Sequence, residues 1–145
     1  MKIKDDKAML AFGRKLAAAL KPGDLVTLSG PLSAGKTTLV RGLLAGLGHR
    51  GEVPSPSFAL VQPYEMLQPP VWHVDLYRIE DPAELDELGL DDVGSEGVLL
   101  VEWPEHAGSR TWSHALALSL AVMEDGARAL TAEVPTAWEA RWPLR

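Results

Sequence analysis

The 145-residue chain contains no cysteine and no asparagine, and each absence excludes a class of chemistry. Without cysteine there can be no disulfide, no thiolate metal ligand and no thiol nucleophile. Without asparagine the chain cannot carry the Asn-Lys-x-Asp motif by which GTPases recognise guanine. Its apolar runs are shorter than the roughly 18–20 residues of a membrane-spanning helix, and no signal-peptide pattern follows Met1. We therefore expect one globular domain over residues 1–145 with no membrane contact.

Basic residues are also missing from one long segment. The formal net charge is −6, and residues 80–96 hold eight carboxylates but no lysine or arginine. A surface that binds bare nucleic acid has the opposite balance of charge. The stretch from Glu80 to Glu96 therefore predicts either a solvated surface or a docking face for a basic partner.

The chain does contain a complete G-x-x-x-x-G-K-[ST] sequence, at residues 30–37. An apolar run at 25–28 precedes it and a helical periodicity at 38–47 follows it, which is the strand–loop–helix order of a phosphate-binding loop. In such a loop, backbone N–H groups and the helix N-terminus face a polyphosphate. Lys36 is then placed for the β- and γ-phosphates and the Thr37 hydroxyl for a magnesium ion. The motif predicts that the chain binds a nucleoside triphosphate.

The remaining patterns predict the elements around this loop. We expect an amphipathic helix over 5–20, strands at 58–61, 71–75 and 98–101, and a helix that starts at Asp81. An Asp-Gly turn at Asp125-Gly126 predicts a hairpin of residues 115–122 and 127–134. The tail, 135–145, is expected to pack its tryptophans on the domain surface. The predicted fold is α/β and P-loop NTPase-like, a mostly parallel sheet flanked by helices with an antiparallel C-terminal hairpin.

Two carboxylates follow predicted core strands, at the sheet edge where open α/β folds place their ligands. Phosphate-loop enzymes use one such acid in the magnesium shell and often another to orient water. Glu102 follows the more apolar run and is the better candidate beside the metal, whereas the sequence leaves the role of Asp75 open. The predicted catalytic set is therefore Lys36, Asp75 and Glu102. His73 is expected to be a structural hydrogen-bonding residue.

Four ordered motifs resemble the bacterial TsaE (YjeE) family, the small ATPase of transfer-RNA threonylcarbamoyladenosine biosynthesis. They are the loop through Thr38, then Ser55-Pro56-Ser57-Phe58, His73-Val74-Asp75-Leu76-Tyr77-Arg78 and Val101-Glu102-Trp103-Pro104. The resemblance covers roughly residues 5–110. It implies a cytoplasmic Mg-ATPase that works with the TsaB and TsaD proteins at tRNA adenosine 37 and meets tRNA only through that complex.

The resemblance also implies roles for individual residues. The triphosphate would be held by Gly30, Ser33, Ala34, Gly35, Lys36, Thr37 and Thr38, with Trp103 beside the nucleotide. Thr37 and Glu102 would ligate magnesium, and Ser55, Pro56 and Ser57 would form a switch-like loop. The chain departs from the family pattern at Pro31 in place of an aspartate, at Ser33 in place of a glycine, at Ser57 in place of a threonine, and near Met9.

Two other classes of protein with this phosphate loop are alternatives: a small-molecule kinase, and an ATP-dependent scaffold with negligible hydrolysis. A kinase needs an arginine-bearing lid over the transferring phosphate. The arginines considered for such a lid are scattered along the chain, at Arg41, Arg50, Arg78 and Arg110. We therefore expect a P-loop ATPase that is weak alone and dependent on its partners.

Overall fold

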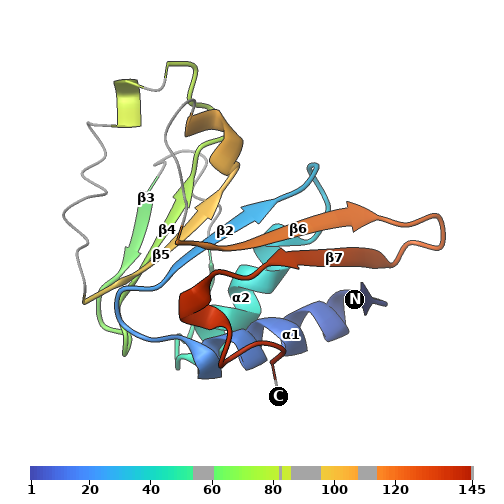
Figure 1. Ribbon diagram of the computed structural model, residues 1–145, viewed down its shortest axis with the longest axis horizontal. Coiled ribbons are helices and arrows are strands. Elements are labelled where there is room, and N and C mark those ends of the chain that lie inside the picture. Colours follow the sequence, from blue (N-terminus) through green and yellow to red (C-terminus); the bar gives the residue numbers. More distant parts are fainter. Residues whose placement is uncertain (54–60, 82, 86–95, 108–113, 145) are drawn as a thin grey trace.

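The computed structural model describes residues 1–53, 61–81, 83–85, 96–107 and 114–144. These residues share one seven-stranded sheet (Figure 1) of order β1-β7-β6-β2-β5-β4-β3. In chain order the strands are β1 Lys2–Ile3, β2 Leu25–Ser29, β3 Val61–Tyr64, β4 Val71–Asp75, β5 Val98–Glu102, β6 Leu116–Val122 and β7 Arg128–Glu133. The helices are α1 Asp6–Ala19 and α2 Lys36–Gly46, with short 3-10 turns η3 Pro104–Ala107 and η4 Thr136–Trp138.

The centre of the sheet is parallel, as the sequence predicts. β2 lies between β5 and β6 and runs parallel to both, and β4 runs parallel to β5. β2 and β5 are buried and largely apolar, which suits strands covered on both faces. The antiparallel strands lie outside this centre: β3 pairs with β4, and β7 pairs with β6 and β1. The predicted C-terminal hairpin is thus confirmed.

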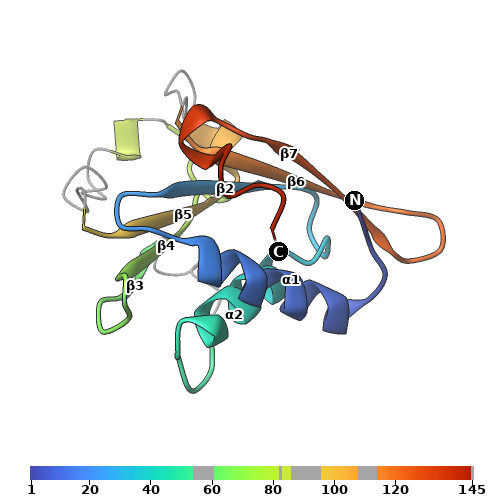
Figure 2. The ribbon, with the colours of Figure 1, turned by 60° about the horizontal axis from the view of Figure 1, so that its bottom comes forward.

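Both α-helices lie on the same face of the sheet (Figure 2). α1 begins where the Asp5 carboxylate accepts a hydrogen bond from the Ala8 N–H at 2.8 Å. The two helices approach closely at glycines: a Cβ on Gly13 would lie 2.3 Å from the Leu39 carbonyl oxygen, and one on Gly42 would lie 2.3 Å from that of Leu10. The described part therefore differs from the expected sheet with flanking helices, because its helices cover one face only.

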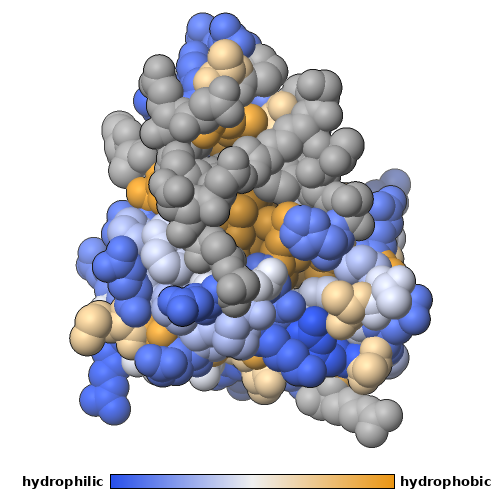
Figure 3. Space-filling view, turned by 60° about the vertical axis from the view of Figure 1, so that its left-hand side comes forward, coloured by the Kyte–Doolittle hydropathy of each residue, from blue (hydrophilic) through white to orange (hydrophobic). Residues whose placement is uncertain are grey.

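A second apolar cluster lies on the opposite face, and the described residues place no α-helix over it. Its members come from the strands, from the segment after β4 and from η3, and include Leu25, Val74, Leu76, Ile79, Leu85, Leu99, Val101 and Ala107. The helix expected from Asp81 is described only as a 3-10 turn at 83–85, in which the Asp81 carboxylate accepts from the Ala83 N–H at 3.0 Å. Figure 3 looks at the β3 side of the molecule and shows apolar surface near the middle of this side, with hydrophilic surface below it and to its right.

Some predicted segments lie outside the described residues. These are the first part of the strand expected at 58–61, the Ser55–Ser57 loop and most of the acidic stretch, including Asp86, Glu87, Asp91 and Asp92. The tail is described through residue 144, and the prediction that its tryptophans pack on the domain surface is wrong for Trp138. Trp138 is only 1% exposed and belongs to the main core, and Trp142 packs its ring against Phe12 with centroids 6.3 Å apart. The tail therefore completes the core instead of covering the surface.

Candidate functional site

The loop between β2 and α2 has the backbone geometry of a tight anion cradle. Gly30 and Gly35 have φ of +148° and +101°, and Ser33 has φ of +69°. A Cβ on Gly30 would lie 2.7 Å from the Leu120 carbonyl oxygen of β6, so a side chain there would collide with the hairpin. α2 begins immediately after Gly35 with no side chain capping its N-terminus, which leaves N–H groups for an anion.

Lys36 is held at the floor of this loop. Its side chain is buried, its Nζ donates to the Gly30 carbonyl at 2.6 Å, and it lies 3.7 Å from the centroid of the Trp103 ring. Burial lowers the pKa of Lys36, while the carboxylates of Glu102 and Asp75 act in the opposite direction. An ammonium that is desolvated and only partly compensated gains strongly from a polyanion placed beside it.

The two predicted carboxylates lie side by side at the carboxyl ends of β4 and β5. Asp75 and Glu102 are register partners, and both are nearly buried. Because side chains alternate along a strand, they share the helix-covered face with Val71 and Leu100 of the main core, which is the face of the loop. Burial raises the pKa of Asp75, and the neighbouring Glu102 acts in the same direction.

His73 contacts the carboxylate of Glu102. Its ring is fully buried, and Nε2 lies 2.6 Å from Oε2 of Glu102. The expectation of a hydrogen-bonding role is confirmed. Within the described part of the chain, the other ring nitrogen, Nδ1, is buried without a hydrogen-bond partner. This contact holds the Glu102 side chain in one orientation.

Aromatic rings form the wall above the acids. Trp103 has φ of +58°, an unusual conformation for a bulky residue, and its ring centroid lies 5.0 Å from that of Tyr77 and 5.3 Å from that of His106. The ring of His106 is anchored by Nδ1, which donates to the Leu76 carbonyl at 2.9 Å. The turn at Trp103 thus aims the indole at Lys36.

These groups line a cleft of about 420 Å³. It brings together most of the predicted site residues, namely Ser33, Gly35, Lys36, Thr37, Thr38, Asp75, Glu102 and Trp103. Gly30 contributes its carbonyl to Lys36, whereas Ala34 is buried beneath the loop. The cleft also includes residues that sequence reasoning did not assign to it, Asp6, Tyr77, Arg78 and Arg128. Arg128 carries no sequence signal, because only the pairing of the hairpin with β1 and β2 brings it to the loop.

Among the described residues, no three His, Cys, Asp or Glu side chains cluster as a ready-made metal cage. The oxygens that converge are the Thr37 hydroxyl and the carboxylates of Asp75 and Glu102. Such hard donors suit Mg²⁺, which takes one or two carboxylates together with substrate phosphates and water. No helix in the described residues is long and apolar enough to span a membrane.

Comparison with known proteins gives concordant matches. The family model described as "Threonylcarbamoyl adenosine biosynthesis protein TsaE" matches residues 3–130, so the similarity continues beyond the expected limit near 110 into β7. The tRNA threonylcarbamoyladenosine biosynthesis protein TsaE of Haemophilus influenzae is 43% identical over 109 residues, which cover 71% of this chain and 69% of that protein. The protein of the same name from Streptomyces coelicolor is 50% identical over 100 residues, 67% of this chain and 68% of that protein.

A solved structure shares the whole fold. The crystal structure of Bacillus subtilis YdiB superposes with a TM-score of 0.82 at 31% identity and covers 97% of this chain and 88% of that one. The tail and the hairpin are therefore part of a shared architecture, since nearly the entire described chain has a counterpart.

Proposed function

The chain belongs to the TsaE family of tRNA threonylcarbamoyladenosine biosynthesis, and from that premise we propose that it is a Mg-ATPase whose slow hydrolysis supports the TsaB and TsaD proteins. The reaction it would serve is threonylcarbamoylation of tRNA adenosine 37. The compartment proposed is the cytoplasm, where ATP and tRNA are both available.

The observation that carries this proposal is the placement of Lys36. A buried ammonium with a lowered pKa lies at a helix N-terminus and lines the same cleft as two buried carboxylates. This arrangement is poor for stability without a ligand, since each charge is only partly compensated. A magnesium-bound triphosphate would supply the missing anion to Lys36 and the missing cation to the carboxylates, so one ligand complements both halves of the cleft.

Each residue has a proposed part in the reaction. The N–H groups at the start of α2 and the Lys36 ammonium bind the phosphates, and the Thr37 hydroxyl and Glu102 would hold the magnesium. Magnesium supplies neutralisation of the charge that develops on the phosphate oxygens. One oxygen of Asp75 is held by the Tyr77 N–H at 2.9 Å, and its other oxygen is proposed to orient the attacking water.

The partner dependence rests on the composition of the cleft. Phosphoryl transfer accelerates by roughly 10³–10⁵ when a partner completes an unfinished site with a cation or an ordered loop. In the described lining of the cleft, Lys36 is the buried cation that faces two buried acids. Arg78 is exposed and Arg128 donates to backbone carbonyls of the loop, which favours a slow reaction until a partner contributes. Ser55, Pro56 and Ser57 are the proposed switch-like loop, and the acidic stretch Glu80–Glu96 is the proposed contact.

The test is a pull-down of TsaB and TsaD by the tagged chain in buffer, with ADP and with ATP, together with ATP turnover at each composition. We expect nucleotide-dependent capture and turnover that rises with both partners. Lys36→Ala serves as the matched control and should lose both. Turnover that stays negligible with partners and ATP would favour the scaffold, and capture indifferent to nucleotide would contradict the proposal.

A charge-reversal variant addresses the docking face separately. Reversal at Asp86, Glu87, Asp91 and Asp92 should weaken capture and remove its salt dependence, because surface charge attraction is screened by salt. Unchanged capture by that variant would make the stretch a solvated surface.

A further inference from the structure

The C-terminal hairpin contacts the phosphate loop at two places. β6 lies directly beside β2, and the Leu120 carbonyl faces Gly30 so closely that no side chain fits between them. On the other strand of the hairpin and nearer its turn, Arg128 opens β7 opposite Val122 and reaches the cleft. In Figure 2 the segment that joins β2 to α2 descends beside β6 and β7. The loop is therefore supported by residues about ninety positions further along the chain.

Arg128 makes its contacts through all three guanidinium nitrogens. Nε donates to the Ala34 carbonyl at 3.0 Å and Nη2 to the Ser33 carbonyl at 3.1 Å. Nη1 donates to the Gly126 carbonyl in the hairpin turn. Hydrogen bonds from a charged donor are stronger than neutral ones, and only a planar fork can reach neighbouring carbonyls in this way. The guanidinium thus ties the hairpin turn to two successive peptides of the loop.

The Ser33 carbonyl belongs to a peptide whose N–H, that of Ala34, donates to the Pro31 carbonyl at 3.2 Å, and the Ala34 carbonyl belongs to the peptide that carries the Gly35 N–H. Ser33 has a left-handed backbone, which for a residue other than glycine is disfavoured. In a trans peptide the C=O and the following N–H point in opposite directions. Holding the Ala34 carbonyl toward Arg128 therefore turns the Gly35 N–H away from it, toward the start of α2 where a phosphate would bind.

We propose that Arg128 is a positioning residue that holds the phosphate loop in its nucleotide-binding conformation and offsets the left-handed backbone at Ser33. The inference rests on the proposed nucleotide binding at this loop. It assigns the C-terminal hairpin a part in nucleotide affinity through the backbone, without contact between Arg128 and the phosphates. Because the β-phosphate region is shared by ADP and ATP, the effect falls on both nucleotides alike.

The test is a double-mutant cycle of Arg128→Ala and Ser33→Gly, with Mg-ADP and Mg-ATP affinities measured by calorimetry. Arg128→Ala should weaken both affinities by about tenfold, as the loss of two charge-assisted hydrogen bonds to the loop implies. In the Ser33→Gly background the same change should weaken them by about threefold or less, because glycine adopts positive φ freely. Equal losses in the two backgrounds would overturn the inference.

Three further measurements separate this role from others. Arg141→Ala removes an arginine with similar carbonyl contacts far from the loop, so it should lower stability and leave Mg-ADP affinity unchanged. Arg128→Lys keeps the charge and the stem but not the fork, and should bind as weakly as Arg128→Ala. If the lysine variant binds normally, or if only Mg-ATP affinity falls, Arg128 acts as a charge on the γ-phosphate and the inference is wrong.

Failure of the inference is distinguishable from failure of the proposed function. If the unmodified chain does not bind Mg-ADP, or Lys36→Ala binds it normally, the proposed site itself is wrong and the inference falls with it. If the unmodified chain binds and Lys36→Ala does not, while Arg128→Ala binds like the unmodified chain, only the inference is overturned.

Discussion

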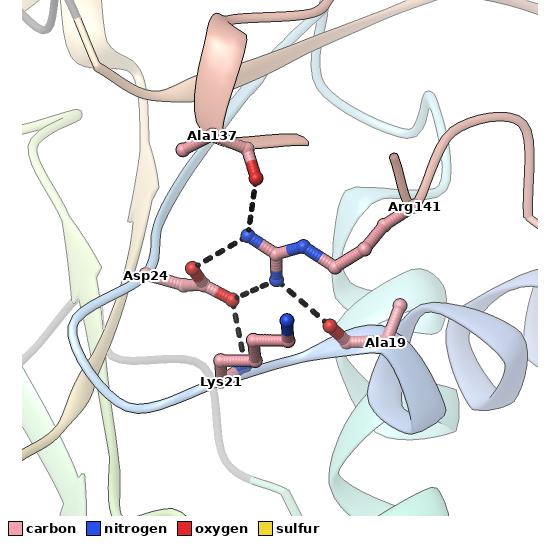
Figure 4. Close-up of polar contacts among 5 residues, drawn as sticks. All are labelled: Ala19, Lys21, Asp24, Ala137 and Arg141. Carbon is pink, nitrogen blue, oxygen red and sulfur yellow. Dashed lines mark hydrogen bonds and ion pairs between the residues drawn. The ribbon is translucent and has the colours of Figure 1, made fainter. Parts of the chain in front are cut away.

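Two clusters of charged side chains, a largely buried one at the tail and a buried one at the phosphate loop, differ in how completely the charges of their members are compensated. At the tail, Arg141 donates twice to the Asp24 carboxylate, at 2.7 and 3.1 Å, and also to the carbonyls of Ala19 and Ala137 (Figure 4). Its guanidinium carbon lies 3.8 Å from the ring centroid of Trp138. Asp24 in turn accepts from the Lys21 N–H at 2.7 Å. This cluster is complete without a ligand.

The cluster at the loop is not complete in the same sense. The pKa of Lys36 is lowered by burial and that of Asp75 is raised by burial, so both charged forms are disfavoured there. Ser33 and Trp103 both have left-handed backbones, and Nδ1 of the buried His73 lacks a partner in the described structure. Strain and partial compensation of this kind concentrate where a ligand is meant to bind. The tail cluster is therefore expected to serve stability, and the loop cluster to serve the ligand binding proposed above.

The largest expected effect comes from removing the central charge of the loop cluster. Lys36→Ala should lower Mg-ADP affinity or ATP turnover by about 10²–10³, since a charge-assisted contact to a highly charged anion is lost. Thermal unfolding should change little, because the removed ammonium was itself poorly solvated. Equilibrium binding, turnover and a melting curve on the same preparation check this. If Lys36→Ala keeps the affinity and turnover of the unmodified chain, the assignment of the loop cluster to ligand binding is wrong.

Substitutions of Glu102 and Asp75 should differ in how they change the magnesium dependence of ATP turnover. Glu102→Gln should raise the magnesium concentration needed for half-maximal turnover by about tenfold or more, because the proposed charged metal ligand becomes neutral. Asp75→Asn should lower turnover with a smaller change in magnesium dependence. Magnesium titrations of turnover for both variants, with Thr37→Ala as the second metal-side variant, make the measurement. Normal turnover in Glu102→Gln beside a loss in Asp75→Asn would reverse the two assignments.

The tail cluster should show the converse pattern. Arg141→Ala leaves Asp24 largely buried without its cation and should destabilise the fold by about 2–3 kcal/mol. Nucleotide affinity should stay unchanged. Urea unfolding and calorimetry measure the two properties, and Arg14→Ala, at an exposed position on α1, is the matched control. A loss of nucleotide affinity in Arg141→Ala would mean that the two clusters are coupled.

Asp75→Asn should expose a trade-off between stability and turnover within the loop cluster. Burial raises the pKa of Asp75 above its unfolded value, so ionised Asp75 opposes folding at neutral pH. The variant should melt roughly 2 °C higher near pH 7, and its advantage should shrink as pH falls and Asp75 becomes protonated.

Asp125→Asn is the control for Asp75→Asn, and its effect on stability at neutral pH should have the opposite sign. The exposed Asp125 has its pKa lowered by the hydrogen bond from Lys2, so its ionised form favours folding. Asp125→Asn should lower stability at neutral pH, and this loss should vanish as pH falls below the ordinary range of an aspartate. Melting curves of both variants across pH test this comparison. If both substitutions change the melting temperature near pH 7 in the same direction, the effect assigned to the burial of Asp75 is contradicted.

The smallest expected effect is spectroscopic. The Trp103 ring lies on Lys36, so nucleotide binding should change tryptophan emission, and Trp103→Phe should remove most of that change. Trp72, Trp112, Trp138 and Trp142 supply the background. A full response retained in Trp103→Phe would place the reporter elsewhere, with Trp72 on β4 the next candidate.

The local features of this protein could be predicted from its sequence. The loop and its lysine, the amphipathic helix near the N-terminus, the strand-end acids and the turn at Asp125-Gly126 each depend on residues within a few positions of one another. Hydrophobic period, capping and turn chemistry act at that range, so single-sequence patterns carry them. The family itself could be recognised because four such local motifs occur in a fixed order.

Only the tertiary structure decided which distant residues meet. The pairing of β6 with β2 brings Arg128 to Ser33, and the return of the tail buries Trp138 and aligns Arg141 with Asp24. The parallel register of β4 and β5 places His73 below Glu102, and both α-helices gather on one face. These contacts join residues separated by tens of positions, and no local period encodes them. They arise because every strand and helix must bury its apolar face against another element, and the residues carried along with those faces then become neighbours.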